Sequence, residues 1–234
     1  MGLARGIFEE GRLRIERATL GSAGESAVAT VAGWIASADR YVLAFDAPLG
    51  WPAALGEALS EHQAGGPLGG QSAALFGRRT DRFVAERMGR TPPEVGADRV
   101  ARVAYAALKT LNNLRKFSGL QVPLAWEQDR DSGAIEVYPP ATLRAHGLSV
   151  DAHRGKTAKA RAFRNQIIDH IESQAELWVS RELLVEDAHL LDAVVCTLAA
   201  ADFVKACCYR PTEEELAHKE GWIWVRDEGQ RSLF

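Results

Sequence analysis

The chain has 234 residues and a mass of 25.5 kDa, with 47% hydrophobic residues, 25% charged residues and a formal net charge of −3. This balance excludes collagen-like, disordered and disulfide-scaffold proteins, and the length fits one large domain that can bury a core without covalent crosslinks. The near-neutral charge argues against general coating of nucleic acid, although a local basic groove remains compatible with it.

Cysteine usage and the absence of long apolar runs indicate the compartment. Cys196, Cys207 and Cys208 are an odd number without Cys-x-x-Cys spacing, which argues against a disulfide framework or a zinc knuckle and favours a reducing cytosol. No apolar run approaches the ~20 residues that span a bilayer, and the first residues lack the apolar core of a signal peptide. We therefore expect a cytoplasmic protein without a membrane partner.

The first fifty residues predict a hairpin, a helix and a buried strand. Residues 2–8 and 12–20 read as paired strands, because apolar and charged residues alternate in the second of them. Apolar residues at helical spacing over 27–35 predict a helix. The continuous apolar run 41–45 is typical of a fully buried strand, and prolines and a glycine in residues 46–52 end it abruptly.

The rest of the chain alternates predicted helices and strands. Expected are an amphipathic helix between residues 97 and 116, a strand over 134–138, helices over 158–175 and about 188–206, and a short strand over 222–225. No internal repeat or linker-like segment divides them. We therefore predict one α/β domain over residues 1–234 with a helical insertion at roughly residues 53–130.

Asp46 is the strongest single indication of chemistry. It follows the apolar run at the place where open α/β sheets carry groups that handle ligands. A carboxylate there is costly unless it is paired, capped or bound to a cation. The alternative is that Asp46 caps the following turn with its own side chain.

Three further acids extend this candidate site. Glu136 alternates with apolar neighbours on a predicted strand, and it either joins a site or faces solvent. Asp192 interrupts an apolar helix whose small residues would let it approach a strand end. Asp187 fits the N-cap of that helix, and we also include it among the candidate metal ligands. Oxygen ligands without a Cys/His cluster suit Mg²⁺ or Mn²⁺, and carboxylates from separate elements could hold two such ions about 4 Å apart.

Basic residues gather in two places. An arginine in the segment 78–82 could neutralise a phosphate while Thr80 or Asp81 caps the following turn, or the segment is a capped helix start with solvated arginines. Residues 154–164 contain five basic residues and no acid, which is typical of a solvated helix face and also of a groove that follows phosphates.

Five segments together resemble the DUF429 family, in order along the chain: residues 45–52, 79–81, 136–139, 191–196 and 220–225. The resemblance implies an RNase H-like, resolvase-like fold with a mixed central sheet flanked by helices, and a predicted nuclease activity. It implies that Asp46, Glu136 and Asp192 are catalytic acids and metal ligands. The segment 79–81 (Arg79, Thr80 and Asp81) is then expected to bind substrate.

The sequence departs from the family pattern in two respects. Family members generally begin with a strand that ends in Gly-Ile-Asp and supplies the first metal ligand, and this chain starts at the segment that follows. Loss of that strand and its acid would leave backbone groups unpaired on both neighbouring strands and an edge open to another copy of the chain. We therefore expect either that the true start of the protein lies upstream or that another segment fills the gap. In addition, His189 stands where family members often carry an acid, and it binds a hard cation less well.

The leading prediction is a Mg²⁺- or Mn²⁺-dependent nuclease or resolvase that hydrolyses nucleic-acid phosphodiesters. Asp46 and Asp192 would be its main ligands, and Glu136 would bind the ion or orient water. The alternative is an interaction or scaffold protein that keeps the fold without the ion site. A nucleotide-binding ATPase of the related actin-like fold is a weaker third prediction, because the sequence has no glycine-rich phosphate loop.

Overall fold

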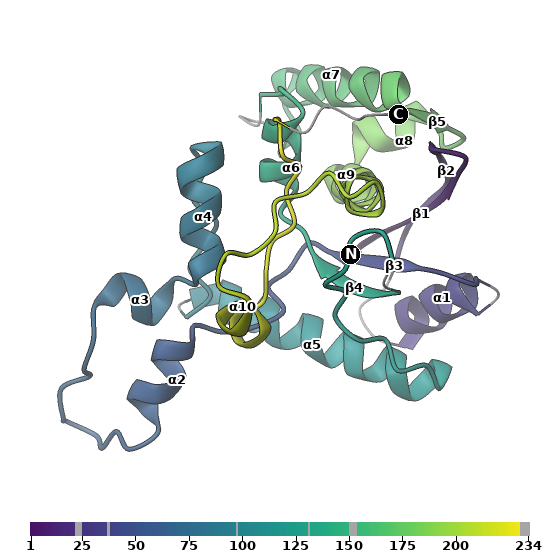
Figure 1. Cartoon of the computed structure of the whole chain (residues 1–234). Helices are drawn as coiled ribbons and strands as arrows, with labels where there is room; N and C mark the ends of the chain where they lie inside the picture. Colours follow the sequence, from purple (N-terminus) through teal and green to yellow (C-terminus); the bar gives the residue numbers. More distant parts are fainter. Residues whose placement is uncertain (22–24, 37, 97, 131, 150–153, 230–234) are drawn as a thin grey trace.

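The computed structural model describes residues 1–21, 25–36, 38–96, 98–130, 132–149 and 154–229, and the chain begins with the expected hairpin (Figure 1). Strand β1 (Gly2–Glu9) pairs antiparallel with β2 (Arg12–Leu20), and a short strand, β5 (Ala175–Leu177), pairs parallel to β2. These three strands form a sheet in the order β1-β2-β5.

A second sheet consists of two parallel strands, β3 (Val42–Phe45) and β4 (Gly133–Glu136). Their register places Phe45 opposite Glu136. Every residue of β4 is buried, whereas every residue of β3 is half-buried. Within the described residues, β1 and β3 each pair with a strand on one edge only, so the five strands are divided between two small sheets.

Parallel strands need a crossover connection, and helices supply it between β3 and β4. The connection contains four helices: α2 (Ala53–Leu59), α3 (Ser72–Phe76), α4 (Arg79–Met88) and α5 (Asp98–Ser118). The first two project from the body of the molecule (Figure 1). Helix α5 packs with α1 (Glu25–Ile35), and both contribute to the apolar cluster on one face of the β3-β4 pair.

Helix α9 (Ala188–Val204) holds the two sheets together, since it contacts β1, β2 and β3. One side of the helix joins the apolar cluster of the hairpin through Leu191 and Val195. Another side joins the cluster of β3 and β4 through Cys196 and Ala199. The small side chains of this helix allow it to lie close to both sheets. Among the described helices none is long and apolar enough to cross a membrane.

The remaining helices surround this core: α6 (Pro139–Ala145), α7 (Ala158–Gln174), α8 (Arg181–Glu186) and α10 (Glu214–Glu220). The four longer helices that the sequence predicts are confirmed as α1, α5, α7 and α9, with small shifts at their ends. The α/β class is confirmed as well.

The prediction of a strand over residues 222–225 is wrong. Ile223 forms one isolated parallel bridge with Glu136, and the Trp224 amide donates to the Glu136 carbonyl oxygen. The apolar pattern has another cause, because Trp222 packs against Phe83 and Trp224 packs edge-on against Phe203. This segment is buried by its aromatic contacts rather than by a strand ladder.

A chain of titratable side chains connects α6, α7 and α9. His146, at the end of α6, lies with Nε2 at 2.7 Å from Asp202 Oδ2 and with Nδ1 at 3.1 Å from His170 Nε2. Arg226 Nη1 is 3.5 Å from the other oxygen of Asp202. Burial, followed by the charges of His146 and Arg226, lowers the pKa of His170, and the opposing effect of Asp202 is smaller.

The lowered pKa of His170 makes the folded state sensitive to acid. Below about pH 6.5, the ordinary pKa of histidine, the unfolded chain takes up this proton more readily than the folded chain, so stability is lost as the pH falls. We expect the urea midpoint of the wild type, followed by circular dichroism, to decrease more between pH 7 and pH 5 than that of His170→Gln. An identical decrease in both proteins would contradict this assignment.

Candidate functional site

Two of the predicted acids lie together where β3 meets α9. Asp46 directly follows the last residue of β3, and Asp192 lies near the start of α9. The guanidinium of Arg154 lies between them, with Nη2 at 2.9 Å from Asp192 Oδ2 and at 3.7 Å from Asp46 Oδ2. Acids from a strand end and from a late helix therefore converge on one cationic group.

The three side chains differ in their access to solvent. The side chain of Asp192 is 6% exposed, that of Asp46 is 38% exposed and that of Arg154 is 59% exposed. Partial burial acts to lower the pKa of Arg154, but the carboxylates of Asp192 and Asp46 raise it overall. The group is thus anchored in the interior through Asp192 and open to solvent through Asp46 and Arg154.

Cys196 lies on α9 one helical turn after Asp192 and is buried. Burial, followed by the charges of Asp46 and Asp192, raises the pKa of its thiol well above the usual value. The raised pKa favours the protonated thiol at neutral pH.

Glu136 lies on the other face of the β3-β4 pair. In parallel register it stands opposite Phe45, and Phe45 belongs to the apolar cluster on the α5 side. Val137, the next residue, belongs to the cluster on the α9 side. Side chains alternate along a strand, so Asp46, the residue after Phe45, is directed to the α9 side. The structure brings Asp46 and Asp192 together and does not bring Glu136 to them.

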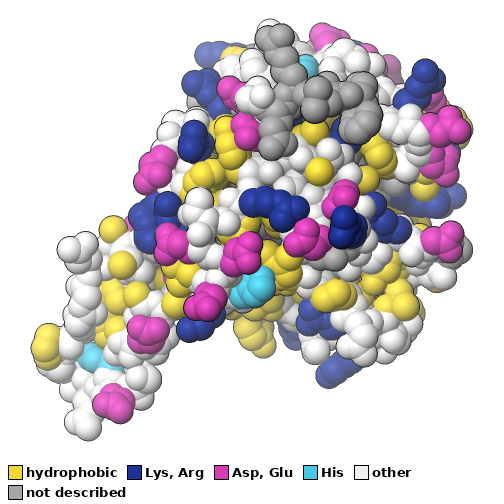
Figure 2. Space-filling view, viewed as in Figure 1, with side chains coloured by type: hydrophobic (Ala, Val, Ile, Leu, Met, Phe, Trp, Pro, Cys, Tyr) yellow, Lys and Arg dark blue, Asp and Glu magenta, His cyan; other side chains and the backbone are white. Residues whose placement is uncertain are grey.

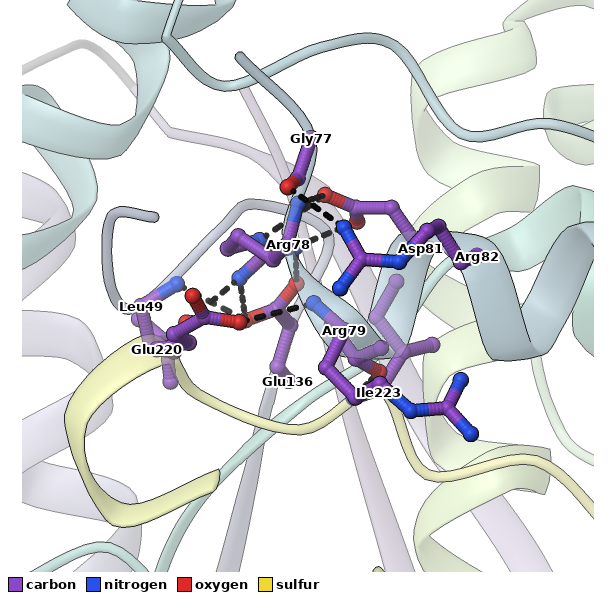
Figure 3. Close-up of polar contacts among 10 residues, drawn as sticks. Leu49, Gly77, Arg78, Arg79, Asp81, Arg82, Glu136, Glu220 and Ile223 are labelled. Carbon is purple, nitrogen blue, oxygen red and sulfur yellow. Dashed lines mark hydrogen bonds and ion pairs between the residues drawn. The ribbon is translucent and has the colours of Figure 1, made fainter. Parts of the chain in front are cut away.

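The Glu136 carboxylate is paired with Arg78 (Figure 3). Arg78 Nη1 donates to Oε2 at 2.8 Å and Nη2 donates to Oε1 at 2.6 Å, which is a two-pronged ion pair. The same guanidinium donates through Nε and Nη2 to Asp81, and its Nη1 donates to the Glu220 carbonyl oxygen at 3.0 Å. Burial acts to lower the pKa of Arg78, but Glu136 and Asp81 raise it overall. Arg78 is therefore a fixed cation in the interior.

Glu220, at the end of α10, extends this network to two helix starts. Its Oε1 accepts from the Ala53 amide at 2.8 Å and its Oε2 accepts from the Arg79 amide at 2.7 Å, at the first residues of α2 and α4. A carboxylate at these positions satisfies amides that the helices leave without partners. The network thus joins the start of α4, the end of β4 and the end of α10.

Two glycines let the backbone approach this network closely. Gly221 has a φ of +84°, and a Cβ added there would lie 2.9 Å from Glu136 Oε2. A Cβ on Gly50 would lie 2.5 Å from the Glu220 carbonyl oxygen. Larger side chains would clash at both positions, which accounts for the glycines in two of the segments that carry the family resemblance.

The segment 79–81, expected to bind substrate, has mainly internal contacts. Thr80 is fully buried and its hydroxyl oxygen accepts from the Ile223 amide at 2.8 Å. Asp81 is buried, pairs with Arg78 and accepts from the Arg78 amide at 2.9 Å. Arg79 is the most accessible of the three, and its Nε donates to Glu213 at 2.9 Å. The structure therefore gives this segment a role in positioning α4.

Asp187 caps α9, as one of the two interpretations of the sequence proposed. Its Oδ1 accepts from the His189 amide at 2.8 Å and from the Leu190 amide at 3.2 Å. The start of β1 packs closely over this helix end, because a Cβ on Gly2 would lie 2.0 Å from the His189 carbonyl oxygen. The Asp187 carboxylate is therefore already engaged by the first backbone amides of α9.

The two carboxylates that pair with Arg154 have the oxygen atoms that a single hard cation needs. In the part of the chain that the structure describes, no three His, Cys, Asp or Glu side chains are placed to hold a metal ion together. Mg²⁺, however, commonly uses only one or two protein carboxylates and completes its shell with water and substrate phosphate. Asp46 and Asp192 already share one positively charged group, so they could hold such an ion.

The sequence singles out neither Arg78 within the segment 78–82 nor Glu220, and it indicates no specific partner for Arg154. Arg78 precedes the segment 79–81, and only the fold shows that it points inward while Arg79 points outward. The basic run 154–164 is not one uniform surface, because Arg164 is buried and donates to the carbonyl oxygens of Val185 and Gly155. A signal for Glu220 existed, since it is an acid directly before a glycine and the buried segment 222–225.

A family model described as "Protein of unknown function (DUF429)" matches residues 1–216. Neither a curated protein nor a solved structure matches the chain.

The buried network predicts very different effects for two adjacent arginines. Arg78→Ala leaves Glu136 and Asp81 as unpaired buried charges, and we expect it to lower the free energy of unfolding by about 3–5 kcal/mol. Arg79→Ala removes one partly exposed ion pair, and we expect a loss below about 1 kcal/mol. Urea unfolding followed by fluorescence measures both, and similar losses for the two variants would contradict the network.

The capping role of Asp187 can be separated from a metal-binding role. Asp187→Ala removes the acceptor for two helix amides, and we expect it to destabilise the fold by about 0.5–2 kcal/mol. We expect its affinity for Mn²⁺, measured by calorimetry, to equal that of the wild type. A clear loss of Mn²⁺ affinity would instead support its assignment as a ligand.

Proposed function

The chain belongs to the DUF429 family, and we propose that it is a divalent-cation-dependent nuclease or resolvase in which Asp46 and Asp192 hold the cation. The observation that carries this proposal is the convergence of both carboxylates on the guanidinium of Arg154. A cationic group already lies between these acids, at the end of a strand and beside solvent. The proposed cofactor is Mg²⁺ or Mn²⁺.

The two acids would have different roles in the site. Asp192 is nearly buried on a rigid helix, so its carboxylate is fixed in place and anchors the ion. Asp46 is more exposed, so its carboxylate lies on the side from which a substrate phosphate would approach. When bound, a divalent cation stabilises charge on a phosphoryl oxygen and lowers the pKa of a bound water.

The proposed site holds one divalent cation rather than two. Glu136 is engaged by Arg78, and Asp187 is engaged by the start of α9. Two carboxylates leave several coordination positions for water and for the substrate, as is usual for Mg²⁺. Glu136 would contribute indirectly, because its network fixes the loop that begins at the end of β3 through the Leu49 amide.

The charge distribution favours contact with only a few phosphates. Acidic and basic side chains are interspersed over the face shown in Figure 2, and the formal net charge is −3. Extended electrostatic binding of a duplex needs many cationic contacts. We therefore propose that nucleic acid is held mainly at the cation site.

We also propose that the protein works in the cytoplasm and has an RNase H-like fold. Cys196, Cys207 and Cys208 are all free thiols and all buried, which supports a reducing compartment. A three-stranded sheet with an antiparallel hairpin beside a parallel pair, bridged by a late helix that carries an acid, supports the fold assignment.

A second candidate function is a scaffold or interaction protein without catalysis. The pairing of Arg154 with both acids favours it, because a guanidinium already neutralises part of their charge. The engagement of Glu136 by Arg78 points the same way. Such a protein would bind no divalent cation at these carboxylates.

Substitution of the two acids tests the proposed activity. Asp46→Asn and Asp192→Asn keep the side-chain shape but remove the charge, so we expect Mn²⁺-dependent cleavage to fall by about 100-fold or more in each. Cleavage is measured on labelled single-stranded DNA, duplex DNA, a four-way junction and RNA, with and without EDTA. These substrates also identify the nucleic acid that the protein prefers.

Arg210→Ala is the matched control, because Arg210 forms a half-exposed ion pair with Glu127 and has no place in the proposed site. We expect its cleavage rate to match that of the wild type. Wild-type activity in Asp46→Asn and Asp192→Asn would contradict the proposed site. A wild type that neither cleaves these substrates nor binds Mn²⁺ would favour the scaffold function.

A further inference from the structure

We infer that Arg154 is the phosphate-binding residue of the proposed site, and that it lies on the two carboxylates until a divalent cation displaces it. This inference rests on the proposed function.

Arg154 and a divalent cation would compete for the same carboxylate oxygens of Asp46 and Asp192. Arg154 Nη2 lies 2.9 Å from Asp192 Oδ2 and 3.7 Å from Asp46 Oδ2, so one nitrogen occupies the space between the acids. A cation bound to both carboxylates would come close to this guanidinium, and like charges at such short distances repel. Ion binding and the present position of Arg154 therefore exclude each other.

The Arg154 side chain can move away from the two carboxylates into solvent. Its side chain is 59% exposed, and a guanidinium that moves toward solvent is readily hydrated. Two other arginines show the contrast, since Arg78 and Arg164 are almost completely buried and donate to several fixed acceptors. Arg154 is held by ion pairs that a divalent cation can replace, whereas Arg78 and Arg164 are part of the interior.

Binding of a divalent cation would change the charge of the site. The three groups named, two carboxylates and one guanidinium, sum to a charge of −1, which disfavours the approach of a phosphodiester. A divalent cation makes the net charge of the group +1, and the displaced guanidinium remains attached beside it. Arginine binds phosphate oxygens through two parallel hydrogen bonds. The site therefore binds its cation first and the phosphate afterwards, with Arg154 as a ligand of the phosphate.

Mn²⁺ titration calorimetry tests the competition without depending on activity. We expect Arg154→Ala to bind Mn²⁺ roughly tenfold more tightly than the wild type, because the competing charge is gone. Arg210→Ala changes the net charge equally at the Glu127 ion pair, which is not part of the proposed site, and we expect its Mn²⁺ affinity to be unchanged. Asp192→Asn should lose Mn²⁺ binding, and urea unfolding of each variant checks that it is folded.

Titration with inorganic phosphate tests the second half of the inference. We expect the wild type to bind phosphate only when Mn²⁺ is saturating. Under those conditions Arg154→Ala should bind phosphate about tenfold more weakly, and Arg154→Lys, which keeps the charge without the paired donors, should lie between them. The substitution thus strengthens Mn²⁺ binding and weakens phosphate binding, which loss of a purely structural contact would not do.

The outcomes separate this inference from the proposed function. If Mn²⁺ binding depends on Asp46 and Asp192 but is equal in the wild type and Arg154→Ala, the inference is wrong and the proposed function stands. If Arg154→Ala binds Mn²⁺ more tightly and phosphate as well as the wild type does, Arg154 is not the phosphate ligand and the inference is again wrong. If no variant binds Mn²⁺, both are wrong.

Discussion

The alternation of side chains at the ends of β3 and β4 is the constraint on which this structure depends. Phe45 and Glu136 are opposite each other in parallel register, so Asp46, the residue directly after β3, is directed to the other face. On one face the Glu136 carboxylate pairs with Arg78 and stabilises the fold. The other face receives the Asp46 carboxylate, which meets Asp192 beside solvent. Two acids that are neighbours at one sheet edge thus serve different purposes.

The structural half of this division is a buried network with Arg78 at its centre (Figure 3). Buried charges are tolerated when they are paired and their remaining hydrogen-bonding groups are satisfied. Here Glu136 also accepts from the Leu49 amide, and Glu220 accepts from the first amides of α2 and α4. The network therefore fixes the loop after β3, and with it the position of the strand end from which Asp46 emerges.

Apolar patterns in the sequence were enough to predict the hairpin, the long helices and the strands before Asp46 and around Glu136, although β3, which the continuous apolar run predicts to be fully buried, is only half-buried. The approach of Asp192 to a strand end was also predicted, because small residues on its helix allow close contact with a sheet, but the same prediction placed Glu136 at that site. Sequence could not assign Glu136 to Arg78, which lies 58 positions away along the chain. Nor could it separate Arg78 from Arg79, because only tertiary packing decides which of two adjacent arginines points inward.

We propose that Asp46 and Asp192 form a cation site that Arg154 occupies in the absence of the ion. The decisive experiment is a crystal of the protein soaked in Mn²⁺ and measured at the manganese absorption edge. We expect an anomalous peak between the Asp46 and Asp192 carboxylates, with the Arg154 side chain turned away from them. The absence of a peak at these carboxylates, with Arg154 still paired to both, would contradict the account.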